Sequence, residues 1–188
     1  MSSLFQFRVG NGFRLESDWV SLTFAPGRGP QASLRVRGGH ADVLLPAGFD
    51  FSRPAAQAWA NRVVVELLRR RAQEVLPARL DAQARRHGLR YRRVVVKNVR
   101  SRWGSCSADG NINLSLWLML LPVRFVDYVI AHELAHLDEM NHGPRFWAVA
   151  DRLLGSPGAA RAAERDLRAY CRTRWGTPAA GAAAGGGQ

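Results

Sequence analysis

A histidine-rich stretch in the second half of the chain has the residue types and spacing to do chemistry. It contains His-Glu-x-x-His from His132 to His136, and His142 follows six residues beyond the second histidine. On a helix, residues four apart project from one face, so the imidazoles of His132 and His136 can reach one metal ion. Glu133 lies about 100° round the helix, where it can contact a metal-bound water but is poorly placed as a ligand. The spacing therefore predicts a zinc-sized site with Glu133 as general base.

The residues around this motif indicate that its helix is buried. We expect the helix to start at Pro122 and to end between Glu139 and Asn141, and it is apolar on nearly every side. Histidine and glutamate side chains in a buried helix are costly unless something satisfies them. A bound metal ion does so, which favours a metal centre over an ordinary helix that carries the motif by chance.

A catalytic zinc site usually has three protein ligands, so the two histidines of the motif leave one to be found. His142 is the best candidate, and a downstream carboxylate from Asp151 or Glu164 is the alternative. With three neutral imidazoles on one Zn²⁺ ion per chain, a fourth position stays open for water. Glu133 takes the proton of that zinc-bound water, the hydroxide attacks a carbonyl, and the proton passes to the leaving amine.

The spacing between the second and third histidines equals that of the metzincin signature, in which a glycine midway lets the chain turn back. Here Glu139 occupies that place, so the chain is not a metzincin and the turn must be made differently. Asn141 and Gly143 flank His142 and tolerate unusual backbone angles. We expect these two residues to make the turn.

The residues that bind substrate are less clearly marked. A donor is needed for the developing oxyanion, and Arg102, Tyr128 and Arg145 are all candidates. The strand expected over 111–117, with Asn113 and Leu114 at its centre, precedes the metal helix and can bind an extended peptide by strand addition. Arg102 and Arg145 complete the set of candidate substrate-binding residues.

The remaining pattern predicts an α+β fold with a β-rich segment over residues 1–50. Trp19–Phe24 and Ser33–Arg37 alternate apolar and polar residues, and Ala41–Leu45 is a further strand, so a small antiparallel sheet is expected. Ser52 and Pro54 signal a helix start. Pro77 is expected to kink or break this helix, which resumes to His87.

A second domain is expected over residues 51–175, in which a small antiparallel sheet packs on the metal helix. Strands over 91–99 and 111–117 are expected to pair around the turn Asp109-Gly110. Two helices, over 145–154 and 160–174, follow the metal helix. The Ala/Gly-rich tail, residues 176–188, is expected to be disordered.

Composition and charge limit the possible partners and cellular location of the protein. The chain has 27 Lys and Arg against 15 Asp and Glu, a formal net charge of +12. The stretch from Arg62 to Arg102 holds thirteen basic and three acidic residues, which can face nucleic acid or simply be a solvated surface. Cys106 and Cys171 form no disulfide pattern. No signal peptide and no membrane-spanning run is visible, so a soluble, cytoplasmic protein is expected.

Several motifs together resemble the YgjP-like metallopeptidase domain family, which is related to WLM and SprT-like zinc proteases. They are Arg102–Ser107, Gly110–Leu114, His132–His136 and Asn141–Trp147, and the resemblance covers roughly residues 15–172. It implies a zincin-like, gluzincin-like minimal protease core with zinc on His132, His136 and His142, and a catalytic Glu133. Cys106, Trp103, Phe146 and Trp147 match the motifs and are expected in the core.

The leading function is therefore a zinc-dependent metallopeptidase that acts on peptide or protein substrates. A metal-dependent nucleotide phosphohydrolase is one alternative, in which the arginines would hold phosphates, although no glycine-rich phosphate loop is present. A DNA-associated SprT-like protease that uses the Arg62–Arg102 region is another. Binding that weakens steeply with salt would favour the DNA-associated protease.

Overall fold

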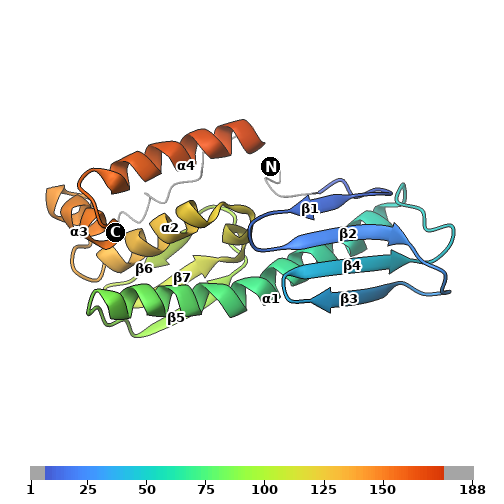
Figure 1. Cartoon of the computed structure of the whole chain (residues 1–188), viewed down its shortest axis with the longest axis horizontal. Coiled ribbons are helices and arrows are strands. Elements are labelled where there is room, and N and C mark those ends of the chain that lie inside the picture. Colours follow the sequence, from blue (N-terminus) through green and yellow to red (C-terminus); the bar gives the residue numbers. More distant parts are fainter. Residues whose placement is uncertain (1–6, 176–188) are drawn as a thin grey trace.

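The computed structural model describes residues 7–175 and confirms an α+β fold, with two sheets and four α-helices in that range. In chain order the elements are β1 (Arg14–Glu16), β2 (Ser21–Pro26), β3 (Ser33–Arg37), β4 (His40–Leu45), α1 (Pro54–Arg86), β5 (Arg93–Lys97), β6 (Gly104–Cys106), β7 (Asn111–Ser115), the 3-10 helix η1 (Leu116–Leu120), α2 (Val123–Ala135), α3 (Pro144–Leu154) and α4 (Ala159–Trp175). The four-stranded and three-stranded sheets lie at opposite ends of the molecule, and α1 runs along both (Figure 1). None of the described helices is both long and apolar enough to cross a membrane. The predicted disordered tail lies outside the described residues.

The first sheet has the strand order β1-β2-β4-β3 and is mixed rather than antiparallel. Strands β3 and β4 lie where the sequence predicts them, β2 begins and ends two residues later than predicted, and β1 was not predicted. The prediction of their pairing is wrong because the tight turn between β3 and β4 places β3 at the outer edge, and β4 then pairs in parallel with β2. Leu22, Phe24 and Val43 are buried on the inner face, where they pack toward α1.

Helix α1 is continuous from Pro54 to Arg86, so the predicted break at Pro77 does not occur. The helix buries one side chain per turn along a single stripe, which includes Leu76 and Leu80 on either side of the proline. Burial of this stripe offsets the hydrogen bond that Pro77 removes, which costs about 3 kcal/mol in a helix interior. Pro54 does occupy the first turn, but Ser52 is not the cap, because the helix is preceded by Arg53 and has no side-chain cap.

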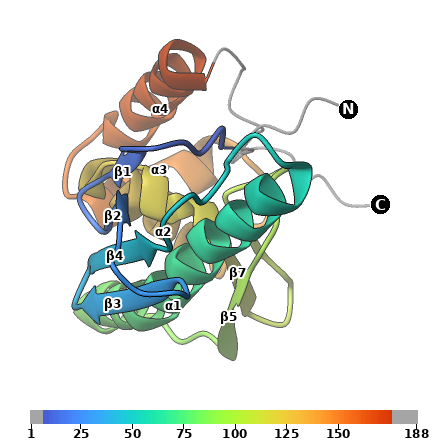
Figure 2. The same ribbon diagram turned by 90° about the vertical axis from the view of Figure 1, so that its right-hand side faces the viewer.

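The second sheet has the order β5-β7-β6, and it differs from the predicted hairpin. The turn at Asp109-Gly110 joins β7 to the short strand β6, with Gly110 at φ +73°, a value that favours glycine. Strand β5 pairs with β7 in parallel on the other side. Viewed from the end, α1 lies between the strands β3 and β4 on one side and β5 and β7 on the other (Figure 2). The buried side chains of both halves form one continuous core, so the division at residue 50 stays a prediction.

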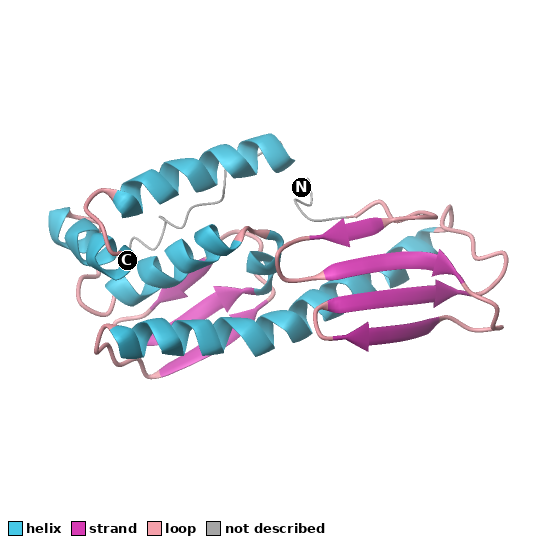
Figure 3. Ribbon diagram, in the orientation of Figure 1, coloured by secondary structure: helices cyan, strands magenta, loops and turns pink. Residues whose placement is uncertain are grey.

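Helices α2, α3 and α4 pack against one another beside the second sheet (Figure 3). Pro122 directly precedes α2, as predicted, and the Val123 N–H donates to Oδ2 of Asp18 at 2.9 Å. The first half of the chain therefore caps the helix that carries the histidine motif. Helix α2 ends at Ala135, earlier than predicted, whereas α3 and α4 lie where the sequence places them.

Candidate metal centre

Three histidines lie together at the C-terminal end of α2. The nitrogens that His132, His136 and His142 offer all lie within 4.8 Å of one another, and Nε2 of His142 is 3.0 Å from Nε2 of His132. His132 and His136 are buried, and His142 is half-buried. Two nitrogens that bind one zinc ion tetrahedrally are about 3.3 Å apart, so this group fits a single ion of that size.

His142 reaches the other two because α2 ends early. The N–H groups of Leu137, Asp138 and Glu139 donate to carbonyls of the last helical turn, and the chain then reverses. Asn141 and Gly143 do not take left-handed angles: the described part of the chain has no positive-φ residue other than glycine, and Gly143 is at φ −79°. The prediction that unusual backbone angles make this turn is therefore wrong.

The ring nitrogens that point away from the cluster have partners. Nδ1 of His132 is 3.4 Å from the hydroxyl of Tyr128, and Nδ1 of His136 is 3.2 Å from the carbonyl oxygen of Glu139. Partners of this kind fix the orientation of a metal-binding imidazole and so direct its other nitrogen toward the ion. Tyr128 is fully buried beneath His132, so it does not fit the predicted alternative role of oxyanion donor.

Two aromatic residues of α3 hold the cluster from one side. The Phe146 ring centroid lies 4.8, 4.6 and 4.5 Å from those of His132, His136 and His142. The indole N–H of Trp147 donates to the carbonyl oxygen of His142 at 3.1 Å. Both residues are buried, as predicted, but their contact with the histidines was not predicted. The sequence did contain a signal for this contact: Phe146 and Trp147 follow His142 closely at the start of a helix, so a short turn brings them back to the histidine.

Glu133 lies on α2 against strand β6. It is 2 % exposed, and a Cβ on Gly104 would overlap its carboxylate, so the glycine lets Glu133 lie directly against β6. Burial raises the pKa of Glu133 to about 8, and the charge of Arg102 acts in the opposite direction. A carboxyl group with a raised pKa in a site of this kind is suited to take and return a proton near neutral pH.

The histidines are also suited to bind a metal ion near neutral pH. Burial lowers the pKa of His136, and the nearby His142 acts in the same direction. Burial lowers the pKa of His142 as well, against the opposing effect of Glu164. Both imidazoles therefore stay neutral, the form that binds metal, to lower pH than a free histidine does.

The alternative third ligands are not part of the histidine group. The carboxylate of Asp151 accepts hydrogen bonds from the N–H groups of Gly158 and Ala160, at 2.7 and 2.8 Å, and so holds the start of α4. Glu164 is ion-paired with Arg168 at 2.6 Å. Among the described residues, the group of potential ligand atoms contains neither carboxylate.

The candidate substrate-binding residues are partly brought to the site. Strand β7, with Asn113 and Leu114, is the central strand and has no free edge, so strand addition there does not fit the sheet. The free edge beside Glu133 belongs to β6. Arg102 lies two residues before the start of β6 and acts electrostatically on Glu133, whereas Arg145 is exposed in the first turn of α3.

Cys106 lies on β6 and is outside the histidine group. It is half-buried, and burial, together with the nearby Glu133, raises the pKa of its thiol to about 11. It forms no disulfide with Cys171, as predicted. Trp103 is buried, as expected for a core residue.

Comparison with known proteins identifies the family. The chain is similar to the metallopeptidase zymogen abylysin of Pyrococcus abyssi, with 20 % identity over 51 % of this chain and 94 % of that one and a TM-score of 0.45, a likeness too low to carry weight. A search of curated proteins finds no match. The family model for the YgjP-like metallopeptidase domain matches residues 8–170, which is most of the chain. The histidine cluster therefore lies in a protein that belongs to the YgjP-like metallopeptidase domain family.

Proposed function

We propose that this metallopeptidase is a zinc enzyme in which His132, His136 and His142 hold the ion and Glu133 is the general base. The observation that carries the proposal is the convergence of three imidazole nitrogens within 4.8 Å, next to a buried carboxylate. Nitrogen-only sites with three protein ligands are typical of catalytic zinc. Structural zinc sites usually have four protein ligands and no use for a buried carboxylate.

The metal ion and the residues around it have different roles in the proposed reaction. When bound, zinc supplies Lewis acidity that activates a water molecule and polarises the scissile carbonyl. Glu133 accepts a proton from the attacking water and passes it to the leaving amine. Arg102, whose charge acts on Glu133, and Arg145 remain the candidates to stabilise the developing negative charge, because Tyr128 is buried behind His132.

The substrate is proposed to bind along strand β6 rather than β7. The three-stranded sheet has β6 at one edge, and an edge strand offers main-chain groups to an extended peptide. Gly104 of β6 contacts Glu133, so a peptide on this edge passes the general base. This arrangement supports hydrolysis of a peptide bond in an extended chain.

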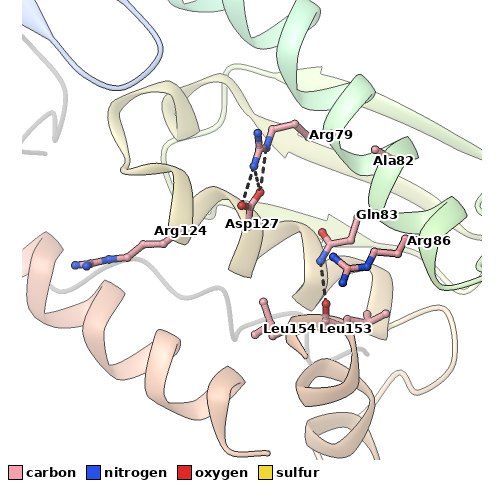
Figure 4. Close-up of a pocket in the computed structure, with 8 residues that line it drawn as sticks. All are labelled: Arg79, Ala82, Gln83, Arg86, Arg124, Asp127, Leu153 and Leu154. Atoms are coloured by element: carbon pink, nitrogen blue, oxygen red, sulfur yellow. Dashed lines mark hydrogen bonds and ion pairs between the residues drawn. The ribbon is translucent and has the colours of Figure 1, made fainter. Parts of the chain in front are cut away.

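The phosphohydrolase alternative has no comparable support. A cavity of about 550 Å³ between α1, α2 and α3 has three arginines in its lining (Figure 4). Arg79 forms an ion pair there with Asp127, and its Nη2 atom is 2.6 and 2.7 Å from the two carboxylate oxygens. Arg124 points away from this cavity, toward α4. Asp127 is about 140° and 180° round α2 from His132 and His136, so this cavity lies on the opposite side from the histidines.

The DNA-associated alternative is also weakened. Five of the thirteen basic residues of the Arg62–Arg102 region form ion pairs with carboxylates of the protein: Arg69 and Arg70 with Glu66, Arg71 with Glu74, Arg79 with Asp127 and Arg85 with Asp81. Paired surface arginines contribute less to the attraction of a polyanion than free ones. These pairs fit a solvated surface better than a phosphate-binding one.

The test of the proposal compares wild type with Glu133→Gln. Both proteins are purified without added metal, their zinc content is measured, and hydrolysis of an unstructured protein substrate is followed. We expect about one zinc ion per chain in both, and a loss of hydrolysis in the variant of at least about a hundredfold. Activity that survives the substitution would overturn the assignment of the general base.

A further inference from the structure

A second cavity lies beside the proposed substrate edge. It has a volume of about 220 Å³ and is formed by the sheet β5-β7-β6 and by the loop that joins β5 to β6. Its polar lining combines two cationic side chains with hydroxyl and amide groups: Lys97, Arg102, Ser101, Ser105, Asn113 and Ser115. Within residues 7–175, no acidic residue lines it.

The two cations of this cavity are not held in ion pairs. Lys97 and Arg102 are both exposed, and neither forms an ion pair with a residue in the described part of the chain. The cavity of about 550 Å³ between α1, α2 and α3 differs, because its Arg79 is paired with Asp127. Charge and hydrogen-bonding capacity in the 220 Å³ cavity are thus available to a ligand.

Sheet geometry links this cavity to the catalytic centre. Side chains alternate between the faces of a strand. On β6, Gly104 faces Glu133 on α2, so the next residue, Ser105, belongs to the opposite face. There Ser105 pairs with Asn113, and the Asn113 Nδ2 group donates to the Ser105 hydroxyl at 3.1 Å. The cavity is therefore on the face of the sheet that turns away from the metal site.

A peptide strand added to β6 continues this alternation. If every second side chain faces α2 and the metal site, the intervening ones face the side on which Lys97 and Arg102 lie. We propose that the cavity is a subsite for an acidic side chain of the substrate, held by these two cations. The proposal rests on the proposed peptidase function, and it defines the preferred substrates as extended peptides with Asp or Glu next to the residue that faces the catalytic centre.

The experiment measures binding, so that it does not depend on cleavage. Zinc-loaded Glu133→Gln protein is titrated against two fluorescein-labelled peptides that differ only in carrying Glu or Gln at every second position. We expect the Glu peptide to bind roughly tenfold more tightly at low salt, and its advantage to shrink as salt is raised. Adding Lys97→Gln should reduce the advantage by about threefold, and Lys97→Glu should shift the preference toward a matching Lys peptide.

A matched control separates the subsite from the general attraction of a protein with net charge +12. Arg86→Gln makes the same charge change at an exposed residue in the other cavity and should leave the preference unchanged. Equal binding of the Glu and Gln peptides, no binding of either, or equal effects of Lys97→Gln and Arg86→Gln would overturn the proposal. Cleavage of the two peptides by wild type is scored separately: absent cleavage with the binding preference intact counts against the peptidase mechanism, not against the subsite.

Discussion

The two sheets that pack along α1 differ in what they bury. The four-stranded sheet buries apolar side chains, and Phe24 is in edge-to-face contact with Phe51 and Trp59, at centroid distances of 6.0 and 6.1 Å. The three-stranded sheet packs beside α2, which buries His132 and Glu133 in the same core. Among the described residues, the buried polar side chains therefore all belong to the second half, whereas the buried side chains of the first half are apolar.

This difference predicts opposite responses to substitution. Burying apolar surface stabilises the fold wherever it occurs, at roughly 25 cal/mol per Å². Burying a histidine or a carboxylate stabilises nothing unless a partner satisfies it. A change in the first sheet should therefore alter stability and leave the metal site intact, whereas a change in the histidine cluster should alter metal binding first.

The largest effect is expected from His142→Ala. This substitution leaves two imidazoles to hold the ion, and we expect zinc affinity to fall by more than the roughly hundredfold that changes in the outer partners of a metal ligand can cause. Competition with a chelator of known affinity measures it. Since His142 is half-buried, chemical denaturation of the metal-free variant should give nearly the wild-type stability. An unchanged affinity would return the role of third ligand to a carboxylate.

Phe24→Ala makes the contrasting change in the first sheet. Phe24 is 1 % exposed, so removing its ring should lower the free energy of unfolding by about 3–5 kcal/mol. Denaturant titration measures this loss, and the zinc content of the folded variant should stay that of wild type. Leu34→Ala on the exposed strand β3 is the control and should change stability by about 0.5 kcal/mol or less. Loss of zinc from folded Phe24→Ala protein would mean that the two halves do not respond separately.

The cost of burying Glu133 should be visible as a dependence of stability on pH in the metal-free protein. Its folded-state pKa of about 8 lies above the value of 4.5 expected when it is exposed. The folded state therefore holds a proton that the unfolded state releases between these values, and stability falls as pH rises through this window. Below pH 4.5 the carboxyl is protonated in both states and this loss is absent.

Glu133→Gln removes that titration. At pH 8 we expect the metal-free variant to be more stable than metal-free wild type by a few kcal/mol, which is several degrees in melting temperature, and the gap should close toward pH 4.5. His136 and His142 act in the opposite direction, because their lowered pKa values cost stability as pH falls below 6.5. Both proteins contain these histidines, so their contribution cancels in the difference. A gap that does not vary with pH would contradict the raised pKa.

Local patterns made much of this structure predictable. The alternation of Ser33–Arg37 predicted the bounds of β3, and the signal at Pro122 predicted the start of the helix that carries His132. What failed depends on contacts between distant segments. Pro77 stays inside a helix because residues on both sides of it share one buried stripe. Strand β5 pairs in parallel with β7 because β6 takes the place beside the Asp109-Gly110 turn.

Prediction of the candidate site from the sequence is limited in the same way by contacts between distant segments. The i, i+4 spacing of His132 and His136 is a local property of a helix, and the sequence displays it directly. The contacts that orient the rings are not local in the same way. Tyr128 is one helical turn before His132, so the sequence predicts that the two side chains are neighbours. Whether the Tyr128 hydroxyl faces the metal site or lies behind the His132 ring depends on packing. The contact between Gly104 and Glu133 needs the tertiary fold.

Tyr128→Phe sharpens the comparison within the second half. It removes the hydroxyl that lies 3.4 Å from Nδ1 of His132 and keeps the buried ring. We expect zinc affinity to fall by about tenfold, with little change in the melting temperature of the metal-free protein. Tyr170→Phe, which changes a half-buried tyrosine on α4, should leave the affinity unchanged. Equal affinities of Tyr128→Phe and wild type would show that the hydroxyl does not orient His132.

The smallest effect is expected where the first half contributes to the second. Asp18 follows β1, yet its carboxylate accepts the hydrogen bond from the Val123 N–H at the start of α2. A carboxylate at a helix N-terminus satisfies an otherwise unpaired N–H and interacts favourably with the helix dipole, so Asp18→Ala should cost about 1 kcal/mol, or 2–4 °C in melting temperature. Asp42→Ala, an exposed carboxylate on β4, is the control and should cost less. Because the histidines lie at the other end of α2, the zinc affinity of Asp18→Ala should equal that of wild type; a lower affinity would mean that the first sheet tunes the metal centre through this helix.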